Sequence, residues 1–326
     1  MKAFKYANQA TKEEAVKLLS AEAAVLAGGT DLLSLMKDYV VTPARLVNLK
    51  SIKELSGVSY DAKKGLGIGA LTTIDQLLAD ANVKREYASL VQAAEGVRSQ
   101  QLQNMGTVGG DLCQRPRCWY YRAGFGLLAL HNGKSLVLEG DNRYHAVLGN
   151  EGPAYFVNPS SLAPALIALG ATVTTFGSKG ARQISLEKFY RSPKREAERE
   201  YDLEPDEILT EILVPSAAGR KNATYEVRQK EALDWPLAAA SVSVEMSGAN
   251  VKSARIVMGH VAPTPWPAPE AEKLLAGKPL SEETAAQAGE AAVRGAKPLS
   301  MNGYKVQLAR VAVKRALLRA SGKEVV

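Results

Sequence analysis

Two adjacent glycines between an apolar run and a helical pattern are the feature that most constrains the fold of this chain. The apolar residues 23–27 fit a buried strand, Gly28, Gly29 and Thr30 follow, and apolar residues recur at helical spacing over 32–36. This order predicts a strand, a tight turn and the start of a helix. Because glycine has no Cβ, such a turn can approach a ligand closely, and its consecutive N–H groups can converge on an anion. The stretch therefore indicates a phosphate site, although a plain turn is the commoner role of a glycine pair by about three to one.

A second stretch of the same kind, residues 106–112 (GTVGGDL), again places glycines and a hydroxyl before apolar residues. Neither stretch has the G-x-G-x-x-G spacing of dinucleotide-binding turns or the Walker spacing G-x-x-x-x-G-K-[ST]. Two anion-type turns on one chain instead suggest a pyrophosphate that is held from two sides.

Composition excludes several classes of function. The 326 residues, 46% hydrophobic and 23% charged, suffice for two domains and a large core. The formal charge of +7 arises from Lys and Arg spread among acids, so no nucleic-acid-binding tract is expected, and solubility or docking onto an acidic partner explains the excess. No run approaches 18 apolar residues, so no membrane span is expected. The start of the chain lacks the apolar core of a signal peptide, which predicts a cytoplasmic protein.

Periodicity predicts alternating regions of strand and helix. Residues 191–207 carry many charges and little apolar matter, so we expect a solvated connection there, and we place a domain boundary at 216–222. The predicted strands are 2–6, 23–27, 45–49, 65–69, 153–157, 171–176, 208–214, 240–246 and 251–259, and the predicted helices are 11–19, 31–38, 73–80, 85–97, 162–169, 269–276, 281–294 and 301–320.

The two glycine stretches, residues 27–32 (AGGTDL) and 107–112 (TVGGDL), resemble the flavin-binding motifs of the FAD subunit of molybdenum hydroxylases, the family of xanthine dehydrogenase and carbon monoxide dehydrogenase. The likeness covers nearly the whole chain, including 158–160 (NPS) and 206–209 (DEIL). Residues 113–122 (CQRPRCWYYR) and 142–146 (NRYHA) resemble the periplasmic aldehyde oxidoreductase branch of that family.

The resemblance implies an α+β fold in two parts. A two-lobed FAD-binding domain of the vanillyl-alcohol-oxidase/PCMH type would span residues 1–216, with lobes of about 1–55 and 56–216. A small domain of one sheet and several helices would span 217–326.

The resemblance also implies a set of FAD contacts. Residues 24–32 would wrap the pyrophosphate, while Thr107, Gly110 and Asp111 would complete its cradle and Leu209 would pack on the flavin. Two positions depart from the family pattern, since Ser161 replaces a frequent Asp and Glu226 replaces a frequent Lys; a carboxylate at 226 is expected to lower the flavin potential. The full predicted set is Ala24, Val25, Leu26, Ala27, Gly28, Gly29, Thr30, Asp31, Leu32, Thr107, Gly110, Asp111, Ser161, Leu209 and Glu226.

No metal centre is expected in this chain. Its three histidines are not at metal-ligand spacing from each other or from a cysteine. By resemblance Cys118 would be the first ligand of an additional [4Fe–4S] cluster, but such a cluster needs four thiolates and the chain has only two cysteines. We therefore expect no [4Fe–4S] cluster and two free thiols, Cys113 and Cys118.

The aromatic and basic residues of this segment have several possible roles. For residues 119–121 (WYY) a core or subunit contact is favoured over stacking on the flavin by about two to one. Arg115, Arg117 and Arg122 are expected to contact a partner rather than to act in catalysis.

The resemblance implies a subunit that transfers electrons. A large partner would hold molybdopterin and hydroxylate the substrate, a small partner would carry two [2Fe–2S] clusters, and FAD on this chain would deliver the electrons to an external acceptor. The chain alone would turn over no substrate. Two alternatives are a self-contained flavin oxidase and a structural subunit with a decayed flavin site. The substrate and the acceptor stay open, and export to the periplasm with a partner subunit is the alternative to a cytoplasmic location.

Overall fold

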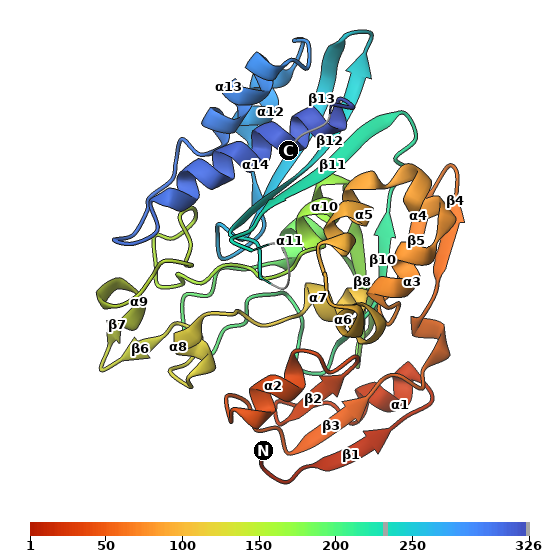
Figure 1. Cartoon of the computed structure of the whole chain (residues 1–326). Helices are drawn as coiled ribbons and strands as arrows, with labels where there is room; N and C mark the ends of the chain where they lie inside the picture. Colours follow the sequence, from red (N-terminus) through yellow and green to blue (C-terminus); the bar gives the residue numbers. More distant parts are fainter. Residues whose placement is uncertain (231–233, 324–326) are drawn as a thin grey trace.

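The computed structural model of the chain describes residues 1–230 and 234–323. Three main sheets follow one another along the chain, from the amino-terminal lobe at the bottom of Figure 1 to the carboxy-terminal helices at its top. Helices and both parallel and antiparallel strands are present, and the predicted α+β class is confirmed.

The amino-terminal lobe is a parallel sheet of order β1-β3-β2 with two short helices. Thr11 caps the first helix by accepting from the Glu14 N–H, and that helix ends at Val16 rather than at the predicted residue 19. The strand, turn and helix predicted around Gly28 are present as β2 and α2. The elements are β1 (Lys5–Asn8), α1 (Lys12–Val16), β2 (Ala23–Leu26), α2 (Leu32–Lys37) and β3 (Arg45–Asn48).

The central lobe contains an antiparallel sheet of order β4-β5-β10-β8-β9, covered by helices. Its strands are β4 (Val58–Asp61), β5 (Gly65–Gly69), β8 (Thr172–Gly177), β9 (Gly180–Ser185) and β10 (Ile208–Val214). Its helices are η1 (Lys53–Leu55), α3 (Ile74–Ala79), α4 (Ala81–Glu86), α5 (Ala88–Glu95), α6 (Gln100–Met105), α7 (Val108–Leu112), α10 (Ala163–Ala168) and α11 (Leu186–Phe189).

Residues 113–158 leave the central lobe and return to it through short elements, at the left of Figure 1. These are α8 (Trp119–Arg122), β6 (Leu130–His131), β7 (Lys134–Ser135) and α9 (Leu136–Glu139). The prediction of a strand at 153–157 is wrong. Within this segment Tyr155 O accepts one backbone hydrogen bond, from Ala146 N, and Asn158, the residue after the segment, donates one to Ala262 O. The two partners belong to different segments, so no ladder of hydrogen bonds forms.

The carboxy-terminal part is an antiparallel sheet with helices α12–α14 on one face (Figure 1). Ala240, Val242 and Val244 pack under these helices, while α5 and α10 contact the other face. On that second face Thr224 Oγ1 lies 2.7 Å from Ser241 Oγ and donates to Ser89 O of α5. The elements are β11 (Arg220–Val227), β12 (Ala238–Ser247), β13 (Asn250–Gly259), β14 (Trp266–Pro267), α12 (Pro269–Leu275), α13 (Glu282–Ala292) and α14 (Tyr304–Ala320).

The charged segment 191–207 is not simply a solvated connection, which corrects the expectation from composition. Tyr201 stacks on Phe189, with ring centroids 5.7 Å apart, and Glu200 is almost fully buried. Tyr201 and the partly buried Leu203 therefore pack against the central core although charges surround them in the sequence. Among the described helices, none is both long enough and apolar enough to cross a membrane.

Candidate functional site

The two glycine turns, far apart in the sequence, are in contact in the structure. A Cβ placed on Gly28 would lie 1.8 Å from Met105 O and 3.3 Å from Gly106 Cα. Only glycine fits at position 28, because the backbone that leads into the second turn occupies the space of a side chain.

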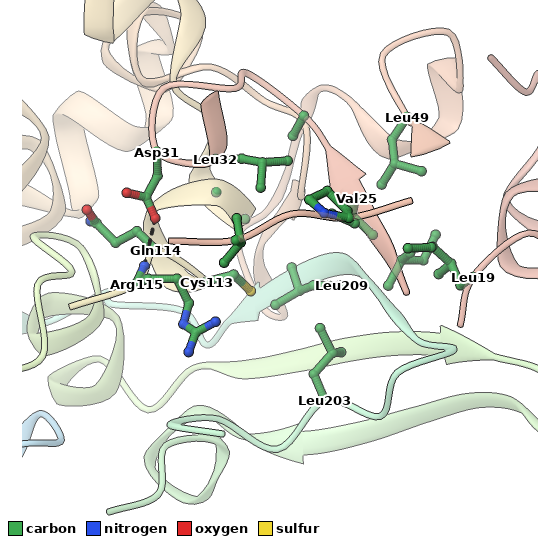
Figure 2. Close-up of a pocket in the computed structure, with 18 of the residues that line it drawn as sticks. Leu19, Val25, Asp31, Leu32, Leu49, Cys113, Gln114, Arg115, Leu203 and Leu209 are labelled. Carbon is green, nitrogen blue, oxygen red and sulfur yellow. Dashed lines mark hydrogen bonds between the residues drawn. The ribbon is translucent and has the colours of Figure 1, made fainter. Parts of the chain in front are cut away.

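A cavity of about 690 Å³ opens beside these turns, between the amino-terminal and central lobes. Figure 2 shows apolar side chains from both lobes on its walls, among them Leu19, Val25, Leu49, Leu203 and Leu209. Most of the predicted cofactor-binding residues line this cavity: Ala24, Val25, Ala27, Gly28, Gly29, Thr30, Asp31, Leu32, Thr107, Gly110 and Leu209.

The first turn presents a row of free backbone donors. The N–H groups of residues 28–32 donate to no other residue in the described part of the chain. Gly29 has a φ of 74°, in the left-handed region that favours glycine. Consecutive unpaired N–H groups on a wall of a cavity form an anion-binding concavity, and a pyrophosphate matches it.

The second turn differs, because its backbone donors are bonded within the protein. Val108 N donates to Thr72 O (2.9 Å), Gly109 N to Ala70 O (2.8 Å) and Gly110 N to Thr107 Oγ1 (3.1 Å). This turn lines the cavity with Thr107, Gly109 and Gly110, but it does not present the row of free N–H groups that the first turn presents.

Asp31 binds the first turn to the segment that follows the second. Its carboxylate accepts from Arg122 Nη2 (2.7 Å), from the Arg115 N–H (2.8 Å, dashed in Figure 2) and pairs with Arg117 Nη1 (3.0 Å). Arg115 pairs in turn with the buried Glu200 at 2.5 Å. The three arginines expected to contact a partner are therefore engaged inside this chain, and the Asp31 charge beside the proposed pyrophosphate site is compensated.

Asp111 and Ser161 do not line the cavity. The Asp111 carboxylate accepts from Ser160 Oγ (2.5 Å) and from the N–H groups of Ser161 (3.3 Å) and Leu162 (3.0 Å). Burial raises the pKa of Asp111, and these hydrogen bonds oppose the rise. Asp111 thus holds the second turn to the start of α10, where Ser161 contributes a backbone N–H.

Glu226 and Leu26 also lie away from the cavity walls. Glu226, on β11, is ion-paired with Arg228 and lies against Gly96. Burial raises the pKa of Glu226, whereas the neighbouring Arg228 lowers it. The lowering of the flavin potential by Glu226 stays a prediction, and Arg228, two residues further along the strand, pairs with this carboxylate. Leu26 packs in a separate small core with Met36 and Leu46.

Several residues on the cavity walls were missed. Cys113, Gln114 and Arg115 directly follow the second motif, and Tyr201 and Leu203 alternate within the charged segment. The i, i+2 spacing of Tyr201 and Leu203 is the sequence pattern that could have indicated that this side of the segment is buried. Burial raises the pKa of Cys113 to about 12, so this thiol is neutral near pH 7.

Both cysteines are free thiols, as predicted. Cys113 lines the large cavity, while Cys118 lines a second cavity, where its Sγ lies 3.2 Å from His145 Nε2. Within the described ranges no group of three or more His, Cys, Asp or Glu side chains is placed to hold a metal ion.

The aromatic residues that follow Cys118 do not line the large cavity. Tyr121 is buried in a core with Leu35 and Leu127, which agrees with the core interpretation, and Trp119 lines the second cavity. The Tyr120 hydroxyl donates to Asp141 O.

Known protein families match nearly the entire chain. The family described as FAD binding domain in molybdopterin dehydrogenase matches residues 2–217, and the CO dehydrogenase flavoprotein C-terminal domain matches residues 223–320.

Relatives and solved structures match over similar lengths. The aldehyde oxidoreductase FAD-binding subunit of Escherichia coli K12 is 32% identical, over 98% of this chain and 99% of the relative. The carbon monoxide dehydrogenase medium chain of Hydrogenophaga pseudoflava is 28% identical, over 96% of each chain. The structure of quinoline 2-oxidoreductase from Pseudomonas putida 86 superposes with a TM-score of 0.77 at 27% identity, over 99% of each chain.

Proposed function

Because this chain belongs to the FAD-binding subunits of the molybdenum hydroxylase family, we propose that it holds FAD in the cavity between its lobes and transfers electrons within a larger oxidoreductase. FAD, when bound, supplies the redox chemistry, and the protein positions and shields it. The electrons would arrive from [2Fe–2S] clusters on a small partner and from molybdopterin on a large one, and would leave to an external acceptor. The chain alone would not act on the substrate.

One observation carries this proposal, namely the unpaired N–H groups of residues 28–32 on the wall of a cavity of about 690 Å³. In the proposal these groups bind the pyrophosphate. Thr107 and Gly110 face it from the second turn, and Leu209 packs on the flavin ring. The apolar walls from both lobes exclude water from the ring. The basic side chain of Arg199 lies on the same cavity and favours an anionic ligand, whereas Arg115 is already paired with Glu200.

Separate cores support the proposed division into a FAD-binding domain of residues 1–216 and a carboxy-terminal domain of residues 217–326. One core joins β5, β8 and β10 to helices α3–α5 and α10, and it also takes in Ala217 and Val257 of β13. Another joins β12 and β13 to helices α12–α14 and takes in Val147 and Leu148 from the central excursion.

The test is the flavin spectrum of the purified full chain. We expect bound FAD at one per chain, or its uptake on addition, with much weaker binding of riboflavin, which lacks the pyrophosphate. Equal binding of riboflavin and FAD would contradict the proposal that the N–H groups of residues 28–32 bind the pyrophosphate. A colourless chain that ignores added FAD would contradict the proposal as a whole.

The two alternative functions gain no support from the site. The described walls of the large cavity carry no histidine, and their cysteine, Cys113, follows the second glycine turn rather than the first, where a flavin oxidase would be expected to place a base or an attachment site. Ser161 and Glu226, which motivated a decayed flavin site, lie away from the cavity. Turnover of an aldehyde or heterocycle by the isolated chain would favour the oxidase. We keep a cytoplasmic location as our proposal, and fractionation of cells tests it against export with a partner.

A further inference from the structure

A second cavity, of about 320 Å³, is lined by residues from 117–119, from 144–159 and from the carboxy-terminal part of the chain. Its lining residues include Trp119, Tyr144 and Trp235, and also His145, His260 and Lys305. The first three are aromatic, and the second three are basic residues that are almost fully buried. Nothing in the proposed electron transfer uses this cavity.

The aromatic residues form walls suited to a flat ring. Trp119 and Tyr144 meet edge to face with centroids 5.5 Å apart, and the Arg117 guanidinium lies 4.6 Å from the Trp235 ring centroid. Tyr144 and Trp235 are 39% and 41% exposed, so both rings are accessible to a ligand from solvent. Aromatic rings pack favourably against one another in offset or edge-to-face geometry, so these walls favour an aromatic ligand.

The Lys305 ammonium is buried without a counter-ion among the described residues. The Lys305 ammonium donates to the carbonyls of Tyr144 (3.1 Å), His145 (3.1 Å) and His260 (2.8 Å), and no carboxylate of the described chain pairs with it. Burial lowers the pKa of Lys305 to about 7. A buried ammonium with only neutral partners is costly, and an anion nearby offsets that cost.

His260 provides an unpaired ring nitrogen at the same place. Its Nε2 is buried and has no hydrogen-bond partner among the described residues, and the same holds for Nδ1 of His145. The backbone of His260 has a φ of 61°, a strained value for a non-glycine residue, and its carbonyl accepts from Lys305. Burial, followed by the charges of Lys305 and Arg228, lowers the pKa of His260 to about 3.

We propose that this second cavity binds a small aromatic carboxylate, with its ring between Trp119 and Trp235 and its carboxylate toward His260 and Lys305. The volume suits a single ring, since ligand cavities begin at about 300 Å³. The carboxylate supplies the missing counter-charge for Lys305 and accepts from the free imidazole N–H of His260. Asp234 is the one carboxylate among the described lining residues, and it lies beside Trp235 rather than in the Lys305 hydrogen-bond set.

The test is a titration of the purified full chain with benzoate, followed by calorimetry and tryptophan fluorescence. Two of the three tryptophans, Trp119 and Trp235, line the cavity, so binding should change their emission. We expect one benzoate per chain, with benzamide and acetate binding at least about tenfold more weakly, because one lacks the charge and the other lacks the ring. Equal binding of benzoate and benzamide, or no binding at about 10 mM benzoate, would overturn the proposal.

Variants locate the site. His260→Asn removes the imidazole but keeps a residue that tolerates positive φ, and Trp235→Leu removes an exposed wall. Each should weaken benzoate binding by about tenfold while the FAD content stays unchanged. Trp266→Phe, outside the lining, is the control and should bind benzoate normally. Benzoate binding that survives both cavity variants would place the site elsewhere and refute the proposal.

Discussion

The two glycine turns have nearly the same sequence and different physical roles. The first leaves the N–H groups of residues 28–32 free on the cavity wall, whereas the second donates to Ala70 O, Thr72 O and its own Thr107 hydroxyl. The difference arises from their neighbours. The second turn lies against Ala70 O and Thr72 O, just after β5, and these carbonyls accept from its N–H groups. The first turn lies against Met105 O, which approaches Gly28 at Cα and accepts from none of the N–H groups of that turn. A glycine motif therefore indicates that another group approaches the backbone closely. The neighbouring segments determine whether that group is a carbonyl of the protein or a ligand.

The aspartates that follow the two turns differ in the same way. Both carboxylates are partly buried, but Asp31 binds arginines, whereas Asp111 binds a hydroxyl and backbone N–H groups. Asp31 joins two segments through ion pairs, and Asp111 joins two segments through hydrogen bonds to neutral groups. The following variants test this contrast, beginning with the largest expected effect.

Gly28→Ala should have the largest effect, because its Cβ would overlap Met105 O and force the two turns apart. We expect FAD affinity to fall by at least about a hundredfold, measured by flavin fluorescence. Gly295→Ala is the matched control, since no atom lies near its added Cβ. Undiminished FAD binding by a folded Gly28→Ala chain would show that the contact between the turns is not needed.

Asp111→Ala should lower the free energy of unfolding by about 2 kcal/mol, because it leaves the buried N–H groups of Ser161 and Leu162 without an acceptor. Asp31→Ala should cost less, about 1 kcal/mol, since Arg117 and Arg122 remain partly accessible to water. Urea unfolding measures both. A larger loss for Asp31→Ala would reverse the assignment of the two aspartates.

Thr107→Val removes the hydroxyl that accepts from Gly110 N. We expect a loss of about 1 kcal/mol in unfolding free energy and a decrease of only about threefold in FAD affinity. Thr107→Ser retains the hydroxyl and should resemble the parent protein. If Thr107→Val weakened FAD as strongly as Gly28→Ala, both turns would bind the pyrophosphate equally.

The smallest expected effect is a dependence on pH. Because burial raises the pKa of Asp111, the folded protein holds this proton at pH values where the unfolded chain, with a pKa of about 3.9, has released it. The contribution of Asp111 to stability is therefore fully present below about pH 3.9 and is lost as pH rises through the folded pKa. The difference in unfolding free energy between the parent and Asp111→Asn isolates this residue and should grow as pH falls. A difference that shrinks on acidification would contradict the direction of the shift.

Local chemistry allowed much of the fold to be predicted. The strand at 208–214 matches β10, and the helices at 269–276 and 281–294 lie within a few residues of α12 and α13, because apolar periodicity and caps are properties of neighbouring residues. The prediction of a strand at 153–157 was wrong because a strand needs a neighbouring strand to pair with. The sequence does not show which backbone segment lies beside it.

The same limit applies to the site. Residues of the first turn were predicted on the cavity because they are contiguous in sequence. The sequence could not distinguish Asp111 and Glu226 from residues that line the cavity. Their carboxylates point toward Ser160 and Arg228, and these contacts are known only from the structure. Arg115 was assigned to a partner chain because Glu200, 85 residues away, was read as part of a solvated segment.

The ion pairs of Asp31 with Arg117 and Arg122 link the amino-terminal lobe to the segment beyond the second turn. A molecule enclosed between these parts cannot leave by a simple separation of the lobes while the pairs hold. Its residence time would then follow the opening rate of the link, and added salt would shorten that time by screening the charges. Retention of the cofactor during purification becomes a kinetic property, distinct from the strength of its binding.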